Sequence, residues 1–244
     1  MVYNLMTLVC RKTALFLILP VFFSSCASQI SGTLQASGQA DLQVYIALEP
    51  RMTMLIGGLA SASGTMQPDA PILDGPAISA SMAGAPGIAS VSLANRTPVV
   101  IEGPVIISRI GEFLAEGSGN TGFITFEQTP QGGRCTVNLS LEGGPQILGL
   151  ISHEINDYLE ALMAPLATGE VVSGTDYLVL VGSVYGRGIA DEIANGSIRV
   201  YINFPGPVQS ARGGTFSGRR AEFIIPLLDI LVLENPLSYE VTWR

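Results

Sequence analysis

The sequence predicts an α+β protein, in which a curved antiparallel sheet of about six to eight strands packs on two or three amphipathic helices. Apolar and polar residues alternate near both ends of the chain, which is typical of strands, whereas the middle repeats apolar residues at three- and four-residue spacing, which is typical of helices. The 28 glycines and 15 prolines supply many turns. The chain shows no internal repeat, so one domain is expected.

The composition excludes several classes of protein. With 48% hydrophobic and 13% charged residues, the chain is too apolar for a disordered protein. A net charge of −8 does not suit nucleic acid. The one histidine, His153, excludes a zinc site built on several imidazoles and leaves almost no base for Ser-His-Asp or Cys-His mechanisms. We therefore expect no enzymatic activity, no metal and no other cofactor.

Residues 1–25 have the features of a signal peptide. Two basic residues, Arg11 and Lys12, precede an apolar run over 14–23. This run is much shorter than the roughly 20 residues that a membrane-spanning helix needs. Two small serines then follow, as is typical of a cleavage site. The segment is therefore expected to direct export and to be removed.

Cys26 is the predicted lipidation site. The serines before it resemble the bacterial lipobox, although Phe23 stands where Leu, Val or Ile is usual. This resemblance implies cleavage before Cys26 and acylation, for example with palmitate, which would anchor the protein to the cell membrane at the periplasmic face of the inner membrane or at the outer membrane. Cleavage would leave ten arginines against twenty acids, so the acyl chains rather than a basic patch would hold the membrane. The alternative is an ordinary secretory peptide with a chance cysteine.

The mature chain is predicted to consist of a short tether, 26–31, and one α+β domain, 32–244. With Cys26 acylated, Cys135 has no cysteine partner for an internal disulfide. We interpret Cys135 as a small buried strand residue, with a reactive thiol as the alternative. The segment 61–88, rich in Ala, Gly, Ser and Pro, is expected to be a mobile loop, or alternatively a lid.

The first predicted element is a strand with apolar residues at every second position from 34 to 46, or a hairpin that turns near Ser37–Gln39. Glu49-Pro50 opens a predicted helix with an apolar face. That face is formed by Met52, Leu55, Ile56 and Leu59. The next expected elements are strands at 89–93 and 99–101 and a short helix at 106–114.

A hairpin is predicted where 123–128 and 134–141 flank a turn with two glycines. Two amphipathic helices are expected next, over 147–166 and from the cap-like Ser173 to 193. The final strands are predicted at 197–204, 208–211, 214–225 and 239–243, with a short apolar segment at 226–233. The two terminal β regions are expected to pair, because each alone has too few partners.

Two motifs resemble functional signatures but lack the required context. His153-Glu154 begins like a zinc-protease helix, but the second histidine is replaced by Asp157. We expect His153 on the solvent side of a helix. Residues 117–122 match G-x-G-x-x-G by letters, but a helix is predicted before them and a strand after them, the reverse of a dinucleotide site. This segment is therefore expected to be a loop.

The charged groups have plain structural interpretations. Asp191-Glu192 are adjacent on a predicted helix and cannot face each other. Glu160, Glu170 and Asp176 gather near a helix junction, where Asp176 suits the first turn of a helix. Arg219-Arg220 is the only basic pair of the mature chain, and we expect it to bond nearby acids, with an anionic headgroup as the alternative. These residues form no catalytic constellation.

Two sets of residues resemble known lipoproteins. Spirochaetal, chiefly treponemal, membrane lipoproteins of unassigned function are similar in three blocks, 158–170, 183–186 and 226–233. The mycobacterial LppM type is similar in the strand 32–48 running into a helix, and in Phe204–Val208, Gly213-Gly214 and Val241–Trp243. The first resemblance implies an envelope setting. The second implies a lipid-binding fold in which a curved sheet wraps around a long helix, and it assigns no site residue.

The sequence thus predicts a non-enzymatic, lipid-anchored envelope protein that holds an apolar ligand, such as a lipid, between sheet and helices. High apolar content and glycine-rich strands favour a concave, mostly apolar site. The alternative from another class is a structural or assembly lipoprotein that binds a protein partner and has no ligand cavity. A lipid or a protein is the expected partner, besides the membrane itself.

Overall fold

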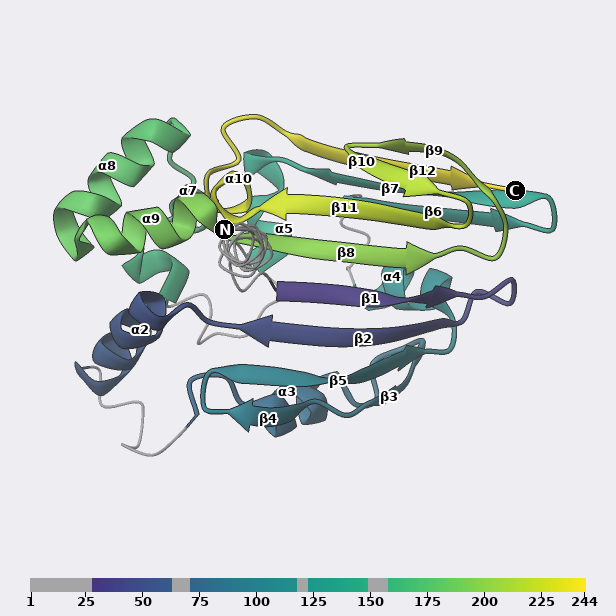
Figure 1. Cartoon of the computed structure of the whole chain (residues 1–244), viewed down its shortest axis with the longest axis horizontal. Coiled ribbons are helices and arrows are strands. Elements are labelled where there is room, and N and C mark those ends of the chain that lie inside the picture. The colour runs from purple at the N-terminus through teal and green to yellow at the C-terminus, as the bar shows by residue number, and fades with distance from the viewer. Residues whose placement is uncertain (1–27, 63–70, 118–122, 149–157) are drawn as a thin grey trace, which may run out of the picture.

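The computed structural model describes residues 28–62, 71–117, 123–148 and 158–244. These residues form a larger sheet, sheet A, and a four-stranded sheet, sheet B, which lies behind it in Figure 1. Most of the helices gather at one end of the two sheets (Figure 1). The predicted α+β class is confirmed.

Sheet A has eight strands in the order β10-β11-β8-β1-β2-β5-β3, with β4 also paired to β5. They are β1 (Ser28–Leu34), β2 (Ala40–Ala47), β3 (Ile88–Val91), β4 (Ala94–Thr97), β5 (Val100–Ile107), β8 (Ser197–Asn203), β10 (Gly214–Ser217) and β11 (Arg220–Pro226). β1 and β2 form the hairpin that was one of two predicted alternatives, and it turns through Gly38 with φ of 84°.

The two terminal β regions pair as predicted, through β1 and β8. This pair is parallel, so the expectation of a wholly antiparallel sheet is wrong at one position. The strands are far apart in sequence, and a long intervening crossover allows parallel pairing, which a tight hairpin cannot provide. Every other strand pair of sheet A is antiparallel.

Sheet B runs in the order β6-β7-β12-β9. Its strands are β6 (Ile124–Thr129), β7 (Gly132–Leu139), β12 (Leu237–Trp243) and β9 (Val208–Arg212). The β6–β7 hairpin is confirmed. A second sheet was not predicted. The chain passes from sheet B to sheet A between two consecutive strands: it leaves β9 in sheet B, turns at Gly213 with φ of 76°, and enters β10 in sheet A.

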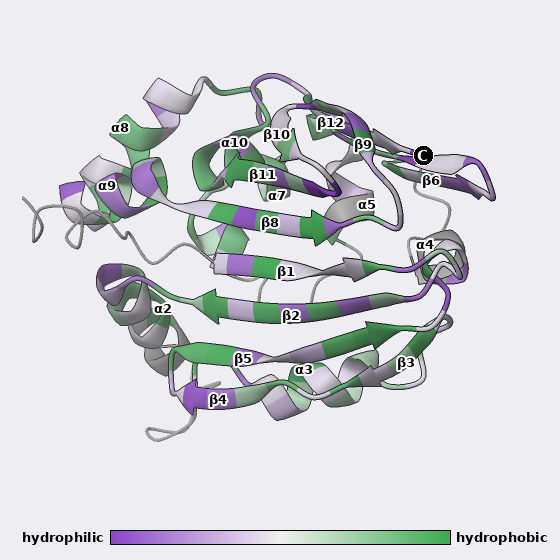
Figure 2. Ribbon diagram, turned by 45° about the vertical axis from the view of Figure 1, so that its right-hand side comes forward, coloured by the Kyte–Doolittle hydropathy of each residue, from purple (hydrophilic) through white to green (hydrophobic). Residues whose placement is uncertain are grey.

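The two sheets cover each other with their apolar faces, so that sheet B takes the place of the predicted helical layer. One core cluster joins residues of both sheets, among them Leu34 and Phe223 of sheet A with Val241 and Trp243 of sheet B. Alternation along the strands explains this arrangement, since residues at every second position face the same side. Figure 2 shows hydrophobic and hydrophilic residues alternating along β8.

Two helices cover the part of sheet A that sheet B leaves free. They are α3 (Gly75–Met82) and α4 (Ile110–Gly117), whose residues Ile78, Ile110 and Phe113 pack against the inter-sheet cluster. Asp74 caps α3 by accepting a hydrogen bond from the Ala77 backbone at 2.9 Å. α3 falls within the segment 61–88 that was expected to be a loop, and residues 63–70 of that segment lie outside the described residues.

The remaining helices form what we call the helical lobe, residues 48–62, 158–196 and 227–236. It contains α2 (Pro50–Ala62), α7 (Pro165–Thr168), α8 (Gly174–Tyr185), α9 (Arg187–Asn195) and α10 (Leu227–Val232). A second core cluster fills this lobe and includes Tyr177, Val181 and Ile193. A further short helix, α5 (Gly144–Leu148), follows a 3-10 turn at Leu141–Gly143 and contacts α7.

Several predicted elements need correction. The helix expected over 173–193 starts at Ser173 as predicted but breaks into α8 and α9, because Gly186 adopts φ of 94°. The strand expected over 214–225 is divided by a turn at Gly218. The helix expected over 106–114 starts only at Ile110, because its first residues complete β5. Residues 28–31, assigned to the tether, belong to β1.

The predicted helix over 147–166 is only partly described. α5 ends at Leu148, residues 158–161 are helical, and residues 149–157 lie outside the described part. The expected stop is confirmed, since Ala164 is extended, Pro165 starts the short α7 and Gly169 ends it in the left-handed conformation. A long helix wrapped by a sheet, as the LppM resemblance implied, does not occur among the described residues: α2, with 13 residues, lies in the lobe. In the same ranges, no helix is long and apolar enough to span a membrane.

Candidate functional site

The inner faces of the two sheets leave a cavity of about 270 Å³ between them. Its walls come from β1, β2, β8 and β11 on one side and from β6, β7 and β12 on the other, with Ile110 of α4 also contributing. The lining is almost entirely apolar and includes Leu42, Val200, Ile202, Phe223, Phe126 and Val137. At about 30 Å³ per molecule, this volume corresponds to about nine waters. It lies just below the range of roughly 300–1,000 Å³ that ligand pockets occupy.

Small residues help to leave this space unfilled. Ala40 of β2 and Cys135 of β7 line the cavity with short side chains, whereas Phe126 and Phe204 line it with large rings. Trp243 packs against both rings, with centroids 4.7 Å from Phe204 and 6.0 Å from Phe126. Gly133 permits this packing, because a Cβ at that position would come within 2.3 Å of the indole ring.

The polar groups at the cavity are few, and its one charged lining residue, Glu240, pairs with Arg134 at 4.0 Å on the outward face of sheet B. Burial raises the pKa of the Cys135 thiol to about 11, so the thiol stays protonated at neutral pH. Burial, and then the charge of Asp229, raises the pKa of the Tyr239 phenol. Tyr239 packs edge-on against Phe223, with ring centroids 5.9 Å apart. The cavity therefore offers hydrophobic contact but no side-chain charge to neutralise an ionic ligand.

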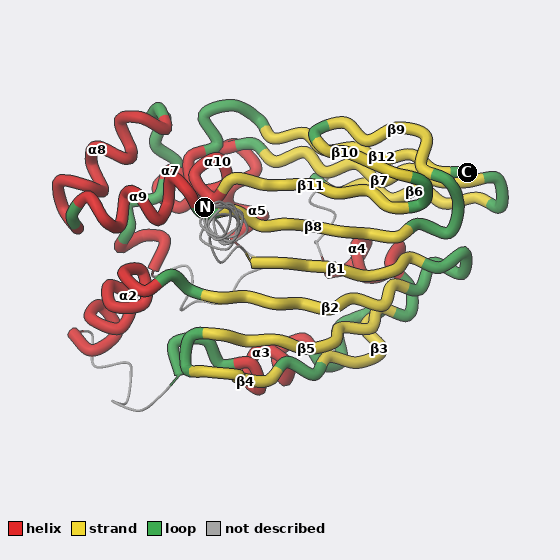
Figure 3. Tube along the Cα trace, in the orientation of Figure 1, coloured by secondary structure: helices red, strands yellow, loops and turns green. Residues whose placement is uncertain are grey.

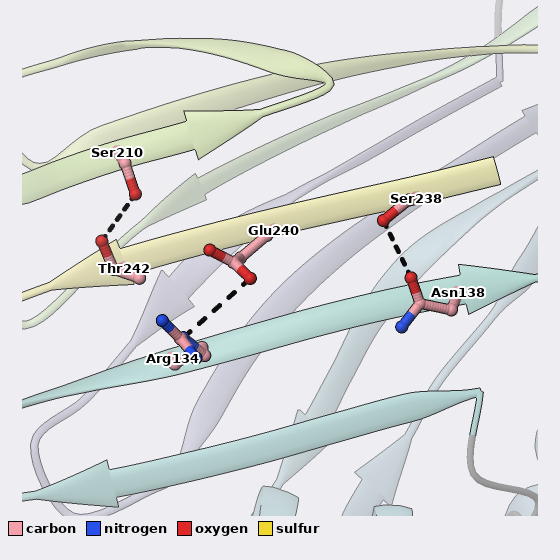
Figure 4. Close-up of polar contacts among 6 residues, drawn as sticks. All are labelled: Arg134, Asn138, Ser210, Ser238, Glu240 and Thr242. Atoms are coloured by element: carbon pink, nitrogen blue, oxygen red, sulfur yellow. Dashed lines mark hydrogen bonds and ion pairs between the residues drawn. The ribbon is translucent and has the colours of Figure 1, made fainter.

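The outward face of sheet B is polar, which fixes the direction of the apolar residues. Figure 4 shows cross-strand pairs on this sheet. Ser238 donates to Asn138 at 2.8 Å, Ser210 and Thr242 share a hydrogen bond at 2.7 Å, and Arg134 lies 4.0 Å from Glu240. Because these residues alternate with Tyr239, Val241 and Trp243 along β12, the latter three point toward sheet A.

The outward face of sheet A carries a more open, polar groove of about 420 Å³. Gln29, Ser31, Gln43, Tyr45 and Glu102 contribute to its lining. Glu102 pairs with Arg96 at 3.3 Å, and both side chains are well exposed. No base, nucleophile and acid converge in this groove, so it resembles a solvated sheet face rather than a catalytic site.

The structure places several of the charged residues singled out from the sequence in structural roles. Asp176 accepts from the Ser173 hydroxyl at 2.7 Å, and the Ser173 oxygen accepts from the Asp176 backbone at 3.1 Å, which confirms helix capping. Glu192 caps α2 across the lobe, accepting from the backbone N–H groups of Arg51 and Met52 at 3.0 and 2.8 Å. The charge of Glu192 also raises the pKa of Glu49, although burial is the larger cause.

The expectation for Arg219 and Arg220 is wrong. Neither bonds an acid of the described ranges: Arg219 donates to the Phe204 carbonyl at 2.9 Å, and Arg220 lies over the Tyr201 ring, 4.6 Å from its centroid. The tight turn before β11 directs Arg219 back toward the end of β8, which accounts for the carbonyl contact. The aromatic face of Tyr201 stabilises the Arg220 cation.

Other predicted features lie partly or wholly outside the described residues. Cys26, His153, Glu154 and Asp157 are in that group. Residues 118–122 also lie outside the described part, but a helix precedes them and a strand follows, as predicted, which is the reverse of a dinucleotide site. Among the described residues, no three His, Cys, Asp or Glu side chains come together in a way that could hold a metal ion.

The cavity between the two sheets was not predicted from the sequence, which indicated a ligand site between sheet and helices. Cys135 is confirmed as a strand residue, although it is partly rather than fully buried, and its place on a cavity wall was missed. The available signal was the alternation of Cys135, Val137 and Leu139, matched by Tyr239, Val241 and Trp243. Two such amphipathic strands at distant positions indicate a second apolar sheet face.

The fold and the cavity define an α+β protein of two packed sheets with an apolar space between them. No protein-family model matches the chain, and no curated protein does either. Among solved structures, the chain is similar to the folded domain of Mycobacterium tuberculosis LppM, determined by NMR. The likeness covers 89% of this chain and 88% of that domain, with 10% sequence identity and a TM-score of 0.42. Such a distant likeness carries no argument about function.

Proposed function

We propose that this protein is a lipid-anchored, non-enzymatic protein of the bacterial envelope that binds an apolar chain, such as an acyl chain of a lipid, between its two sheets. The observation that carries the proposal is the cavity of about 270 Å³ with its almost wholly apolar lining. The site differs from the one expected from the sequence, because sheet B rather than a layer of helices forms its second wall.

The chemistry of the lining favours an apolar ligand over a polar one. An apolar chain gains about 0.8 kcal/mol for each methylene removed from water, whereas a polar group without a partner is costly to bury. A methylene occupies nearly the volume of a water molecule, so the cavity accommodates a chain of about nine carbons. A longer acyl chain would extend beyond the cavity, and a two-chain lipid would place only part of one chain inside.

The membrane attachment in this proposal depends on Cys26 and the segment before it. The basic residues, the short apolar run and the small residues before Cys26 support export and acylation. An envelope location, at the periplasmic face of the inner membrane or at the outer membrane, follows from this proposed anchor. The alternative, an assembly lipoprotein without a cavity, has less support because the inter-sheet space is present.

Native mass spectrometry tests the ligand. The chain without residues 1–25, carrying Cys26→Ser to prevent acylation, is incubated with decanoate and with a bacterial lipid extract. We expect a discrete adduct. Val200→Phe, which adds volume to the cavity wall, should abolish the adduct, whereas Gln43→Phe on the exposed outer face of sheet A should retain it. An adduct that is equal in both variants would contradict binding between the sheets.

A further inference from the structure

The position of β1 restricts how the protein can lie on a membrane. β1 starts at Ser28, two residues after Cys26. Since an extended chain spans at most about 3.6 Å per residue, the start of this strand lies within about 7 Å of the acylated residue. Ser28 lies opposite Ile198 near the beginning of β8, so this edge of sheet A must lie close to the bilayer.

The helical lobe occupies that same edge of sheet A. The chain passes from the end of β2 into α2, from α9 into the start of β8, and from the end of β11 into α10. Register confirms the alignment, because Gln29 of β1 pairs with Tyr45 of β2 and with Arg199 of β8. Figure 3 shows the lobe helices at the end of the sheets where β1 begins.

The lobe also carries most of the exposed apolar side chains. Six large apolar residues are exposed in the described part of the chain, and four of them belong to the lobe. These four are Met54, Val171, Val179 and Val184, which are 69%, 90%, 67% and 54% exposed. The other two, Phe216 and Ile224, lie on sheet A.

The charge of the lobe indicates what kind of contact it can make. The lobe holds eight acidic residues and two arginines, Arg51 and Arg187. Anionic headgroups would repel such a surface, so charge attraction cannot hold it to a membrane. Apolar side chains at the level of the headgroups can hold the lobe to a membrane, because they lose contact with water there.

We infer that the helical lobe rests on the bilayer that receives the acyl anchor, with exposed apolar side chains of the lobe, Val171 and Val179 among them, in its interface. This inference rests on the proposed acylation of Cys26. The sheets then project away from the membrane, and contact by the lobe does not require anionic lipid. The apolar side chains that enter the interface thereby lose contact with water.

Depth-dependent fluorescence quenching tests the inference on the full acylated protein. A Cys135→Ala background carries either Val179→Cys or Phe216→Cys, each labelled with an environment-sensitive fluorophore. Phe216 is the matched control, since it is also exposed but lies opposite Ala221, at the far end of sheet A from the lobe. The proteins are placed in phosphatidylcholine vesicles with and without nitroxide-labelled lipid. Val171→Cys provides a second lobe position if Val179→Cys fails to fold.

We expect the lobe label to lose most of its fluorescence to nitroxide lipid, the label at 216 to keep its fluorescence, and the quenching of the lobe label not to increase when anionic lipid is added. Equal accessibility of both labels to a water-soluble quencher, with an acyl mass present on Cys26, would overturn the inference and leave the proposed function intact. Absence of any acyl mass on Cys26 would overturn the anchor in the proposed function and, with it, this inference.

Discussion

The core of the helical lobe and the core between the sheets are both apolar, but they are packed differently. In the lobe, Tyr177, Val181 and Ile193 have no exposed surface, and the Tyr177 hydroxyl donates to the Leu162 carbonyl at 3.2 Å. Between the sheets, Val200 and Ile202 remain only partly buried although they face inward, because they border the cavity. The comparison shows a filled core in the lobe and unfilled apolar space between the sheets.

The largest expected effect compares the same substitution in the two regions. Ile193→Ala in the lobe should lower the free energy of unfolding by about 3–4 kcal/mol, since it creates a void in a filled core. Ile202→Ala should cost only about 1–2 kcal/mol, because this side chain already lacks neighbours on its cavity side. Urea unfolding of both variants measures the difference. Equal costs would show that the two cores are equally well packed.

A second difference concerns the thiol on the cavity wall. Because burial raises the pKa of Cys135 from 9.0 to about 11, only about one per cent should be thiolate at pH 9, against about half in the unfolded chain. Iodoacetamide should therefore react about fifty-fold more slowly with the native protein at pH 9. Since the folded pKa is the higher one, the stabilising contribution of the protonated thiol is intact below pH 9 and is lost as the pH rises toward 11.

Mass-spectrometric counting of alkylated Cys135 in native and urea-unfolded protein provides this measurement. A native rate at pH 9 close to the unfolded rate would show that the thiol is solvated and that the cavity is open to water. A saturating apolar ligand should slow the native reaction further.

Adding one methylene group tests the same difference in packing, and the effect on stability should differ between the two cores. Val181→Ile in the lobe should destabilise the protein by about 1–3 kcal/mol, because no room is available for the extra group. Val200→Ile should be neutral or stabilise by up to about 0.8 kcal/mol, since the group enters unfilled apolar space. Thermal unfolding of the two variants reports the sign. Destabilisation by Val200→Ile would argue that the cavity is filled in the native protein.

The smallest effect is expected outside both cores. Arg134 and Glu240 face solvent on sheet B at 4.0 Å, and Arg134 is more than half exposed. Arg134→Gln should change the free energy of unfolding by less than about 0.5 kcal/mol and leave ligand binding unchanged. A cost above 1 kcal/mol in urea unfolding would show that the outward face of sheet B contributes more than the comparison allows.

Local chemistry predicted several elements of this fold correctly. The capping side chain of Ser173 and the proline at the start of α2 act through their immediate neighbours, and the β6–β7 hairpin joins adjacent segments, so the sequence alone identified them. Apolar alternation likewise identified most strands. These features need no knowledge of how distant segments meet.

The cavity and the second sheet could not be predicted in the same way. The opposing walls of the cavity include Val137 and Val200, which are far apart in the sequence and meet only through the packing of the two sheets. The strand β12 pairs with β7 and β9, and nothing local specifies that choice. The break at Gly186 was also missed, because apolar spacing continues through it.

The most direct test of the central claim is an NMR measurement of contacts between ¹³C-labelled decanoate and the methyl groups of the protein. Binding between the sheets predicts nuclear Overhauser effects from the chain to Val137 and Val200, one on each wall of the cavity. It predicts none to Val181, which lies fully buried in the lobe core. Contacts to lobe methyls alone, or no contacts at saturating ligand, would contradict the claim that the inter-sheet cavity is the binding site.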